Sequence, residues 1–109
     1  MKVFRVTTDF WISAYRSTLE KEGIPFYFYK TGDKSAGAIL IKIFNFEEEV
    51  TLYHRINNLN GKQTWEKLLS GSEDQIDQAI KNQCNFDPDV WVLVVDDPKG
   101  KNFLNEFDE

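Results

Sequence analysis

Apolar residues recur along the chain with the period of a helix in two segments. Large apolar side chains at every fourth position from 11 to 19 predict a helix from about Asp9 to Glu22. Gly23 is placed to end this helix, and Pro25 prevents its continuation. A second helix is predicted at about residues 72–83, where Ser and Gln three positions apart form a capping box before an apolar stripe.

Other segments alternate between apolar and polar residues, or are rich in aromatic and β-branched residues between turn residues, and these patterns predict strands. The predicted strands are Lys2–Val6, Phe26–Lys30, Ala38–Phe44, Val50–Ile56, Gln63–Leu68 and Val90–Val95. The last of these is apolar at both parities, which indicates a central strand with both faces buried. We therefore expect Val92, Val94, Ile39 and Ile41 to be nearly inaccessible to solvent.

This order of elements predicts an α+β fold: a mixed, mostly antiparallel sheet with helices packed on both faces. Two segments, Lys2–Lys30 and Gln63–Val95, each contain a helix between two predicted strands, and each is a right-handed crossover if its strands run parallel. No linker, repeat or low-complexity tract divides the chain, so residues 1–109 are predicted to form a single domain. Apolar residues at 103, 104 and 107 predict a short docked tail.

Composition supports a core that needs no cross-links. The 109 residues are 41% hydrophobic and include 9 Phe, 4 Tyr and 3 Trp, whereas Cys84 is the single cysteine and has no disulfide partner. The longest apolar run, Val90–Val95, is far shorter than the roughly 20 residues that a membrane span requires. The first residues lack an apolar stretch of signal-peptide length, so we expect a cytoplasmic location without membrane contact.

Charge is distributed unevenly. Residues 1–67 carry a net charge of +2 and residues 68–109 a net charge of −7, which gives −5 for the whole chain. Acidic surface disfavours binding to nucleic acid or to anionic membranes, because such binding depends on neutralising phosphate groups.

Three segments, taken together, resemble a known family. They are Asp9–Pro25 (DFWISAYRSTLEKEGIP), Gly32–Ile43 (GDKSAGAILIKI) and Phe86–Leu104 (FDPDVWVLVVDDPKGKNFL). Over nearly its full length, the chain resembles the small bacterial proteins of domain-of-unknown-function family 1491. The resemblance implies a cytoplasmic bacterial protein with a sheet flanked by helices. The family has no established activity, so no catalytic residue is carried over.

The turn at Gly32–Gly37 has the glycine spacing of a phosphate-binding loop but not its chemistry. Such a loop needs Lys and Ser or Thr directly after the second glycine and then a helix, whereas here Ala38 and Ile39 open a strand. A simple turn with glycines at positive φ explains the pattern. If the chain has a ligand site, we predict it here, with free N–H groups beside a lysine receiving an anion. The predicted binding residues are Lys30, Gly32, Asp33, Lys34, Ser35 and Gly37.

Other reactive residues give weaker indications. Cys84 and His54 are candidates for a thiolate–imidazole pair, but Cys84 lies near a helix end and is predicted to be an inert, partly buried thiol. His54 has the parity of the core positions in its strand. Asp87 and Asp89 precede the strand Val90–Val95 and two further aspartates follow it, so more than ~20 Å separates the pairs. Asp87 is predicted to be a turn residue, and no metal site is identified.

Aromatic and basic residues on the strands suggest one further site. Depending on register, the following could share a sheet face: Tyr27, Tyr29, Lys42, Tyr53, Arg55, Trp65 and Lys67. Such a face is typical of platforms that stack single-stranded bases.

Three functions therefore stay open. The preferred hypothesis is a noncatalytic cytoplasmic binding or adaptor module, because no acid–base or nucleophile set emerges. The alternatives are a small enzyme with a small-molecule substrate and a protein that binds single-stranded nucleic acid, which the net charge disfavours. The partner is an unidentified protein or small molecule, and no cofactor is indicated.

Overall fold

The computed structural model describes residues 7–44, 49–57, 63–97 and 104. Its elements follow the predicted order closely. They are α1 (Thr8–Lys21), β1 (Phe26–Lys30), β2 (Ile39–Phe44), β3 (Val50–Asn57), β4 (Gln63–Gly71), α2 (Glu73–Phe86) and β5 (Trp91–Asp96). The predicted strand Lys2–Val6 lies outside the described residues, as do Phe103 and Phe107 of the predicted tail. Leu104 of that tail is buried among the residues that α1 covers.

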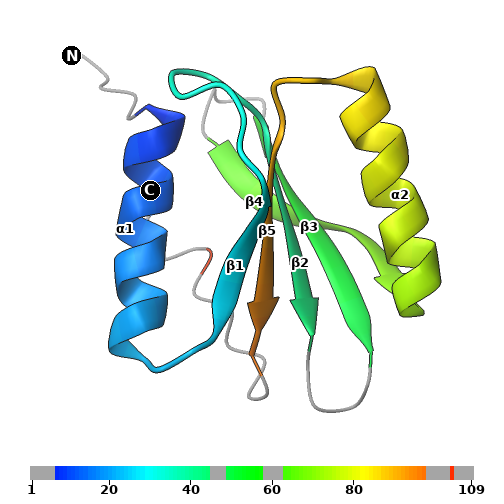
Figure 1. Cartoon of the computed structure of the whole chain (residues 1–109), viewed down its shortest axis with the longest axis horizontal. Helices are drawn as coiled ribbons and strands as arrows, with labels where there is room; N and C mark the ends of the chain where they lie inside the picture. The colour runs from blue at the N-terminus through cyan, green and yellow to red at the C-terminus, as the bar shows by residue number, and fades with distance from the viewer. Residues whose placement is uncertain (1–6, 45–48, 58–62, 98–103, 105–109) are drawn as a thin grey trace.

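The five strands form one sheet in the order β1-β5-β2-β3-β4 (Figure 1). β5 runs parallel to β2, and every other neighbouring pair is antiparallel. The prediction of a mixed, mostly antiparallel sheet is confirmed, and β5 is indeed an inner strand. Since β4 is antiparallel to β3 and β3 to β2, α2 connects two strands, β4 and β5, that run in the same direction.

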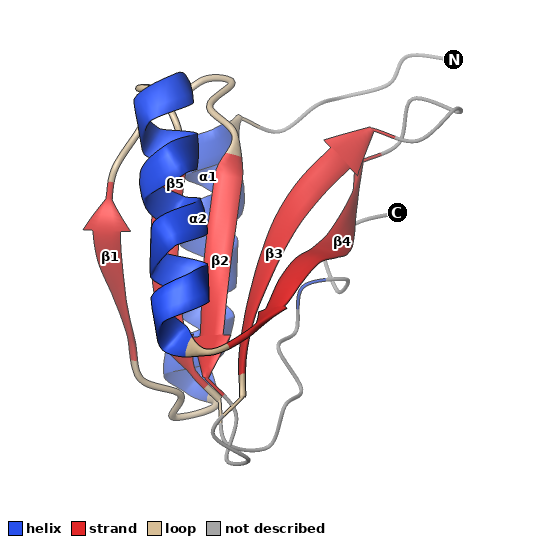
Figure 2. Ribbon diagram, turned by 90° about the vertical axis from the view of Figure 1, so that its right-hand side faces the viewer, coloured by secondary structure: helices blue, strands red, loops and turns tan. Residues whose placement is uncertain are grey.

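The two helices lie on opposite faces of the sheet, which gives three layers (Figure 2). Alternate side chains of the inner strands fill the two cores. The core under α1 contains Trp11, Ile12, Tyr15, Leu19, Ile39, Ile41, Ile43, Trp91, Leu93, Val95 and Leu104. The core under α2 contains Leu40, Val50, Leu52, Ile76, Ile80, Val90 and Val92. The four residues expected to be inaccessible are buried, with no more than 5% of any side chain exposed.

The helix boundaries have the predicted local chemistry. Ser72 and Gln75 form the capping box of α2, each side chain accepting a hydrogen bond from the other residue's backbone N–H. At the end of α1, Gly23 has a φ of 71°, and the N–H of Ile24 donates to the Leu19 carbonyl at 2.9 Å. This arrangement is a Schellman motif, in which glycine avoids the strain of positive φ.

The helices cover their faces of the sheet unequally. α2 packs against β3 and β4 and lies beside β2, and in Figure 1 it stands well away from β1. The face of β1 and β5 on the α2 side is therefore left partly open. Neither helix in the described part of the chain is both long enough and apolar enough to cross a lipid bilayer.

Candidate functional site

Four backbone N–H groups of the predicted binding turn at 32–37 already have acceptors. The N–H groups of Ser35 and Ala36 donate to the Asp33 carboxylate at 3.2 and 2.9 Å. The N–H of Asp33 donates to the Asp89 carbonyl at 3.0 Å, and the N–H of Gly37 donates back to the Asp33 carbonyl at 3.2 Å. Each of these four N–H groups already has an acceptor within the protein, so none of the four is available to an anion.

The same turn holds the N-terminus of α1. The carbonyls of Ser35 and Lys34 accept hydrogen bonds from the N–H groups of Thr8 and Asp9, at 3.2 and 2.9 Å. These donors belong to the first turn of the helix, where no carbonyl within the helix can accept them. The turn therefore caps α1 from a distant part of the chain.

Lys30 and the two glycines fasten the turn to the segment that leads into β5. The Lys30 ammonium donates to the carbonyls of Pro88 and Val90. A Cβ atom on Gly32 or Gly37 would collide with the Asp89 carbonyl, so close packing explains both glycines. The expectation that they supply positive φ is wrong, because among the described glycines only Gly23 has one. The structure brings all six predicted binding residues together, and their role in binding a ligand stays a prediction.

The other predicted reactive groups have local partners. His54 Nε2 lies 3.2 Å from Glu66 Oε1 on β4, and the Asp87 carboxylate accepts the N–H of Asp89 at 3.0 Å, as expected for a turn residue. Cys84 is partly buried against the core under α2. Across the described ranges, no three His, Cys, Asp or Glu side chains gather in a group that could hold a metal ion.

The predicted aromatic and basic sheet face does not exist as one surface. The register pairs Lys42 with Leu52 and Ile41 with Tyr53, so Lys42 and Tyr53 lie on opposite faces. Tyr53 and Trp65 pack under α1, where the Arg55 guanidinium lies 5.6 and 5.9 Å from the ring centres of Trp11 and Trp65. The seven side chains are therefore divided between the two faces, and a single base-stacking platform is excluded.

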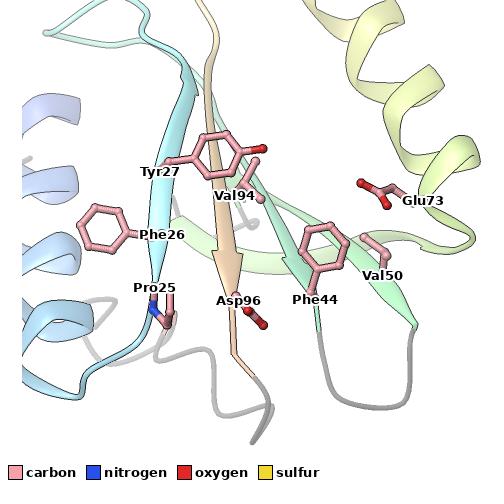
Figure 3. A pocket seen from close by; sticks show the side chains of 8 residues that line it. All are labelled: Pro25, Phe26, Tyr27, Phe44, Val50, Glu73, Val94 and Asp96. Carbon is pink, nitrogen blue, oxygen red and sulfur yellow. The ribbon is translucent and has the colours of Figure 1, made fainter.

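A groove lies instead between β1 and α2. One end has a volume of about 700 Å³ (Figure 3), and the part beside α2 has a volume of about 480 Å³. The first part is lined by Pro25, Phe26, Tyr27, Phe44, Val50, Glu73, Val94 and Asp96. The second is lined by Tyr27, Tyr29, Lys42, Glu73, Asp74, Asp77, Gln78, Ile80, Lys81 and Val94. The shared residues Tyr27, Glu73 and Val94 join the two parts into one groove.

β1 forms an aromatic wall because its side chains alternate. Phe26 and Phe28 pack under α1, and the Phe26 ring in Figure 3 points away from the groove. Tyr27 and Tyr29 line the groove and are 58% and 56% exposed. The Tyr27 ring extends across β5 toward Val94, its partner in the strand register. Two exposed tyrosines beside an apolar floor are a typical ligand-contacting surface.

Lys42 lines the part of the groove beside α2 as a buried cation. Only 6% of its side chain is exposed, and its Nζ lies 2.6 Å from Asp77 Oδ1 and 3.1 Å from Glu73 Oε2. The ammonium is also 4.9 Å from the centre of the Phe44 ring. Glu73 and Asp77 are four residues apart, so both project from the same side of α2. The three charges form an ion triad that joins α2 to β2.

The triad changes the proton affinity of the lysine. Burial by itself lowers the pKa of Lys42, but its hydrogen bonds to Asp77 and Glu73 outweigh this effect and raise the pKa above the ordinary value of 10.5. Lys42 is therefore fully charged at neutral pH.

We expect the stabilising contribution of Lys42 to be constant from about pH 7 to about pH 10 and to decline at higher pH. Above its ordinary pKa the unfolded chain releases the Lys42 proton while the folded protein keeps it, so the folded state binds more protons and raising the pH favours unfolding. Urea unfolding of the wild type and of Lys42→Met, from about pH 8 to about pH 12, measures this. Above pH 10.5, the free energy of unfolding of the wild type should fall relative to that of Lys42→Met. A pH-independent difference would contradict the raised pKa.

The groove as a whole is acidic. Its lining contains four carboxylates, from Glu73, Asp74, Asp77 and Asp96, and two ammonium groups, which gives a formal charge of −2. The side chains of Glu73 and Asp77 remain 55% and 48% exposed while each binds Lys42. Both carboxylates therefore keep acceptor capacity on the groove side.

The sequence contains a separate signal for each part of this groove. Lys42 interrupts an otherwise apolar strand, and Glu73 and Asp77 have the spacing of one helix face. The alternation of Phe with Tyr in β1 distinguishes a buried parity from an exposed one. Only the strand order shows that these three features converge.

Comparison with known proteins places the chain in a family. Residues 6–105 match the family described as "Protein of unknown function (DUF1491)". No curated protein matches the chain. A 1.87 Å crystal structure of a DUF1491 family protein from Caulobacter crescentus aligns with a TM-score of 0.84 and 28% identity, covering 92% of this chain and 95% of that one.

Two solution structures are also similar to this chain. An NMR structure of a DUF1491 family protein from Caulobacter crescentus has a TM-score of 0.83 and 27% identity, with 94% of each chain covered. Protein Atu0922 from A. tumefaciens has the same fold, with a TM-score of 0.80, 20% identity and coverage of 97% and 98%. The family match spans nearly the whole sequence and confirms the resemblance found in its segments. The chain belongs to the DUF1491 family of proteins of unknown function.

Proposed function

We propose that the protein is a noncatalytic cytoplasmic binding module and that the groove between β1 and α2 is its binding site. The observation that carries this proposal is the pair of exposed tyrosines, Tyr27 and Tyr29, beside an apolar floor in a groove of about 700 Å³ at its larger end. Ligand sites in proteins combine such apolar surface with a few polar groups, which Lys42 and its two carboxylates supply here.

The geometry favours binding over catalysis. The Lys42 ammonium is already bound by the carboxylates of Glu73 and Asp77. A general base or nucleophile needs a free lone pair aimed at a reacting atom, and a lysine held charged by two carboxylates does not offer one. A nucleic-acid platform is not supported, because the groove is acidic and the predicted base-stacking face is divided.

Neutral aromatic probes test the site without assuming the charge of the ligand. We expect indole and phenol to shift the backbone amide NMR signals of residues 26–29, 73–78 and 92–96, with weak but saturable binding. Tyr27→Ser together with Tyr29→Ser should weaken this binding about tenfold, because the aromatic wall is lost.

The matched control is Phe86→Ser, since Phe86 is 87% exposed and does not line the groove. This variant should bind the probes as the wild type does. Shifts that scatter over the surface, or that persist unchanged without the two tyrosines, would overturn the assignment of the site.

A further inference from the structure

We propose that the ligand of this groove is a short basic peptide segment of a partner protein, with an arginine or lysine side chain held between the tyrosines of β1 and the carboxylates of α2. This inference rests on the proposed function and adds the chemical class of the ligand. It follows from the charge of the groove, from the way the protein already holds a cation there, and from the groove's length.

Charge is the first argument. The groove lining has a formal charge of −2, and its exposed wall on α2 carries Glu73, Asp74 and Asp77. Residues 68–109, which include this wall, have a net charge of −7. A cationic ligand gains attraction both from the local carboxylates and from this wider field, whereas an anion meets repulsion from both.

Lys42 shows which chemistry the site recognises. Its ammonium is bound by two carboxylates and lies 4.9 Å from the centre of the Phe44 ring. This pairing of an aromatic face with carboxylates is the environment in which proteins hold organic cations. The groove repeats it beside Lys42, where Tyr27 and Tyr29 face a helix wall whose Glu73 and Asp77 side chains are still about half exposed.

Arginine fits this second position especially well. A guanidinium is planar, so it can stack on a tyrosine ring while its edge donates two hydrogen bonds to a carboxylate. Asp96, at the Pro25 end of the groove, and Asp74, on α2, are exposed carboxylates that do not bind Lys42. Each offers a pairing site for a cation that does not compete with the ion triad.

The dimensions favour a peptide. From Glu73 to Lys81, α2 rises about 12 Å along the groove. An extended chain covers this length with three to four residues at about 3.3 Å each. The floor under such a chain is apolar at Val94, and the groove stays open along its length between β1 and α2. A segment with alternating basic and small apolar residues complements both surfaces.

Two matched peptides test the inference by isothermal titration calorimetry. Acetyl-Ala-Arg-Ala-Arg-amide is the ligand, and the same peptide with citrulline in place of arginine is its neutral, nearly isosteric control. We expect the arginine peptide to bind at least about tenfold more tightly, with an affinity that falls as salt is raised. Its amide shifts should map to the groove.

Two pairs of variants separate the site from general acidity. Asp74→Asn with Asp96→Asn removes two groove carboxylates without touching the partners of Lys42, and it should weaken the arginine peptide about fivefold or more. Glu20→Gln with Glu22→Gln removes the same amount of charge at and beside the end of α1, on the opposite face, and should have little effect. Equal losses in both pairs would overturn the inference in favour of nonspecific attraction.

The remaining outcomes are also decisive. If indole shifts the groove amides but the arginine peptide binds no better than the citrulline peptide, the inference fails while the proposed function stands. If spermine binds in the groove as tightly as the arginine peptide, the ligand is a free polyamine and the peptide assignment is overturned. If the groove amides shift with protein concentration alone, together with dimer formation in sedimentation experiments, the occupant is a second copy of the chain.

Discussion

Removing both partners of Lys42, by Glu73→Gln with Asp77→Asn, is expected to lower the free energy of unfolding by about 2–4 kcal/mol. The substitution leaves an ammonium that is only 6% exposed without a counter-charge. Breaking a fully buried ion pair from one side costs about 3–5 kcal/mol, and the smaller value applies here because the neighbouring groove admits water. Urea unfolding at neutral pH measures the loss.

A third substitution distinguishes charge from shape. Adding Lys42→Met to the double variant removes the unpaired cation and places an apolar chain of similar length in the same space, so most of the lost stability should return. If the free energy of unfolding of the double variant is within about 0.5 kcal/mol of the wild-type value, the triad does not restrain α2. If adding Lys42→Met does not restore stability, the stability lost in the double variant comes from the substitutions on α2 themselves.

The second large effect is expected from Gly32→Ala, which should destabilise the protein by about 2–4 kcal/mol. A Cβ at this position would collide with the Asp89 carbonyl oxygen and would approach the carbonyl carbons of Asp89 and Val90 to 2.7 and 2.8 Å. These are backbone atoms at the entry to a central strand, so they cannot move aside as the end of a side chain would. Thermal and urea unfolding both report the loss.

Gly23→Ala is the matched control, because Gly23 has room for a Cβ atom but a backbone conformation that alanine rarely adopts. No atom lies within 4 Å of the Cβ that this change adds, but the φ of 71° is strained for alanine. Its cost should be about 1 kcal/mol, from the backbone alone. If Gly32→Ala is no worse than Gly23→Ala, the turn at 32–37 is more adaptable than its contacts indicate. Ser35→Ala, at an exposed position in the same turn, should stay within about 0.5 kcal/mol of the wild type.

Much of the fold could be predicted because its local signals agree with its burial. The apolar run at 90–95 correctly indicated a strand with two buried faces, and the capping box at Ser72 correctly placed the start of α2. Gly23 ends α1 through the positive φ that its position implied. In each of these three cases, the structure is determined by a few residues that are neighbours in the sequence.

The groove could not be predicted in the same way, because its parts come from distant segments. Tyr27, Lys42 and Glu73 become neighbours only through the insertion of β5 beside β1 and the position of α2 over the sheet. The aromatic and basic sheet face was predicted wrongly because the sequence does not show the strand register. A register difference of one residue moves a side chain to the other side of a sheet. Likewise, nothing local to Gly32 reveals that Asp89 packs against it.

The place of β5 in the sheet has a consequence for how the chain folds. β5 is the last of the described strands in sequence, yet it separates β1 from β2 and pairs with both. During synthesis, the strand β1 therefore has no neighbouring strand to pair with until residue 96 is available, while the β2–β3–β4 meander can form earlier. Closing such distant pairings is slow compared with forming local hairpins, so we expect the pairing of β1 with β5 to form late in folding. A ribosome stalled before Trp91 would leave one edge of β2 and all of β1 without a strand partner, and such unpaired edges are prone to aggregation.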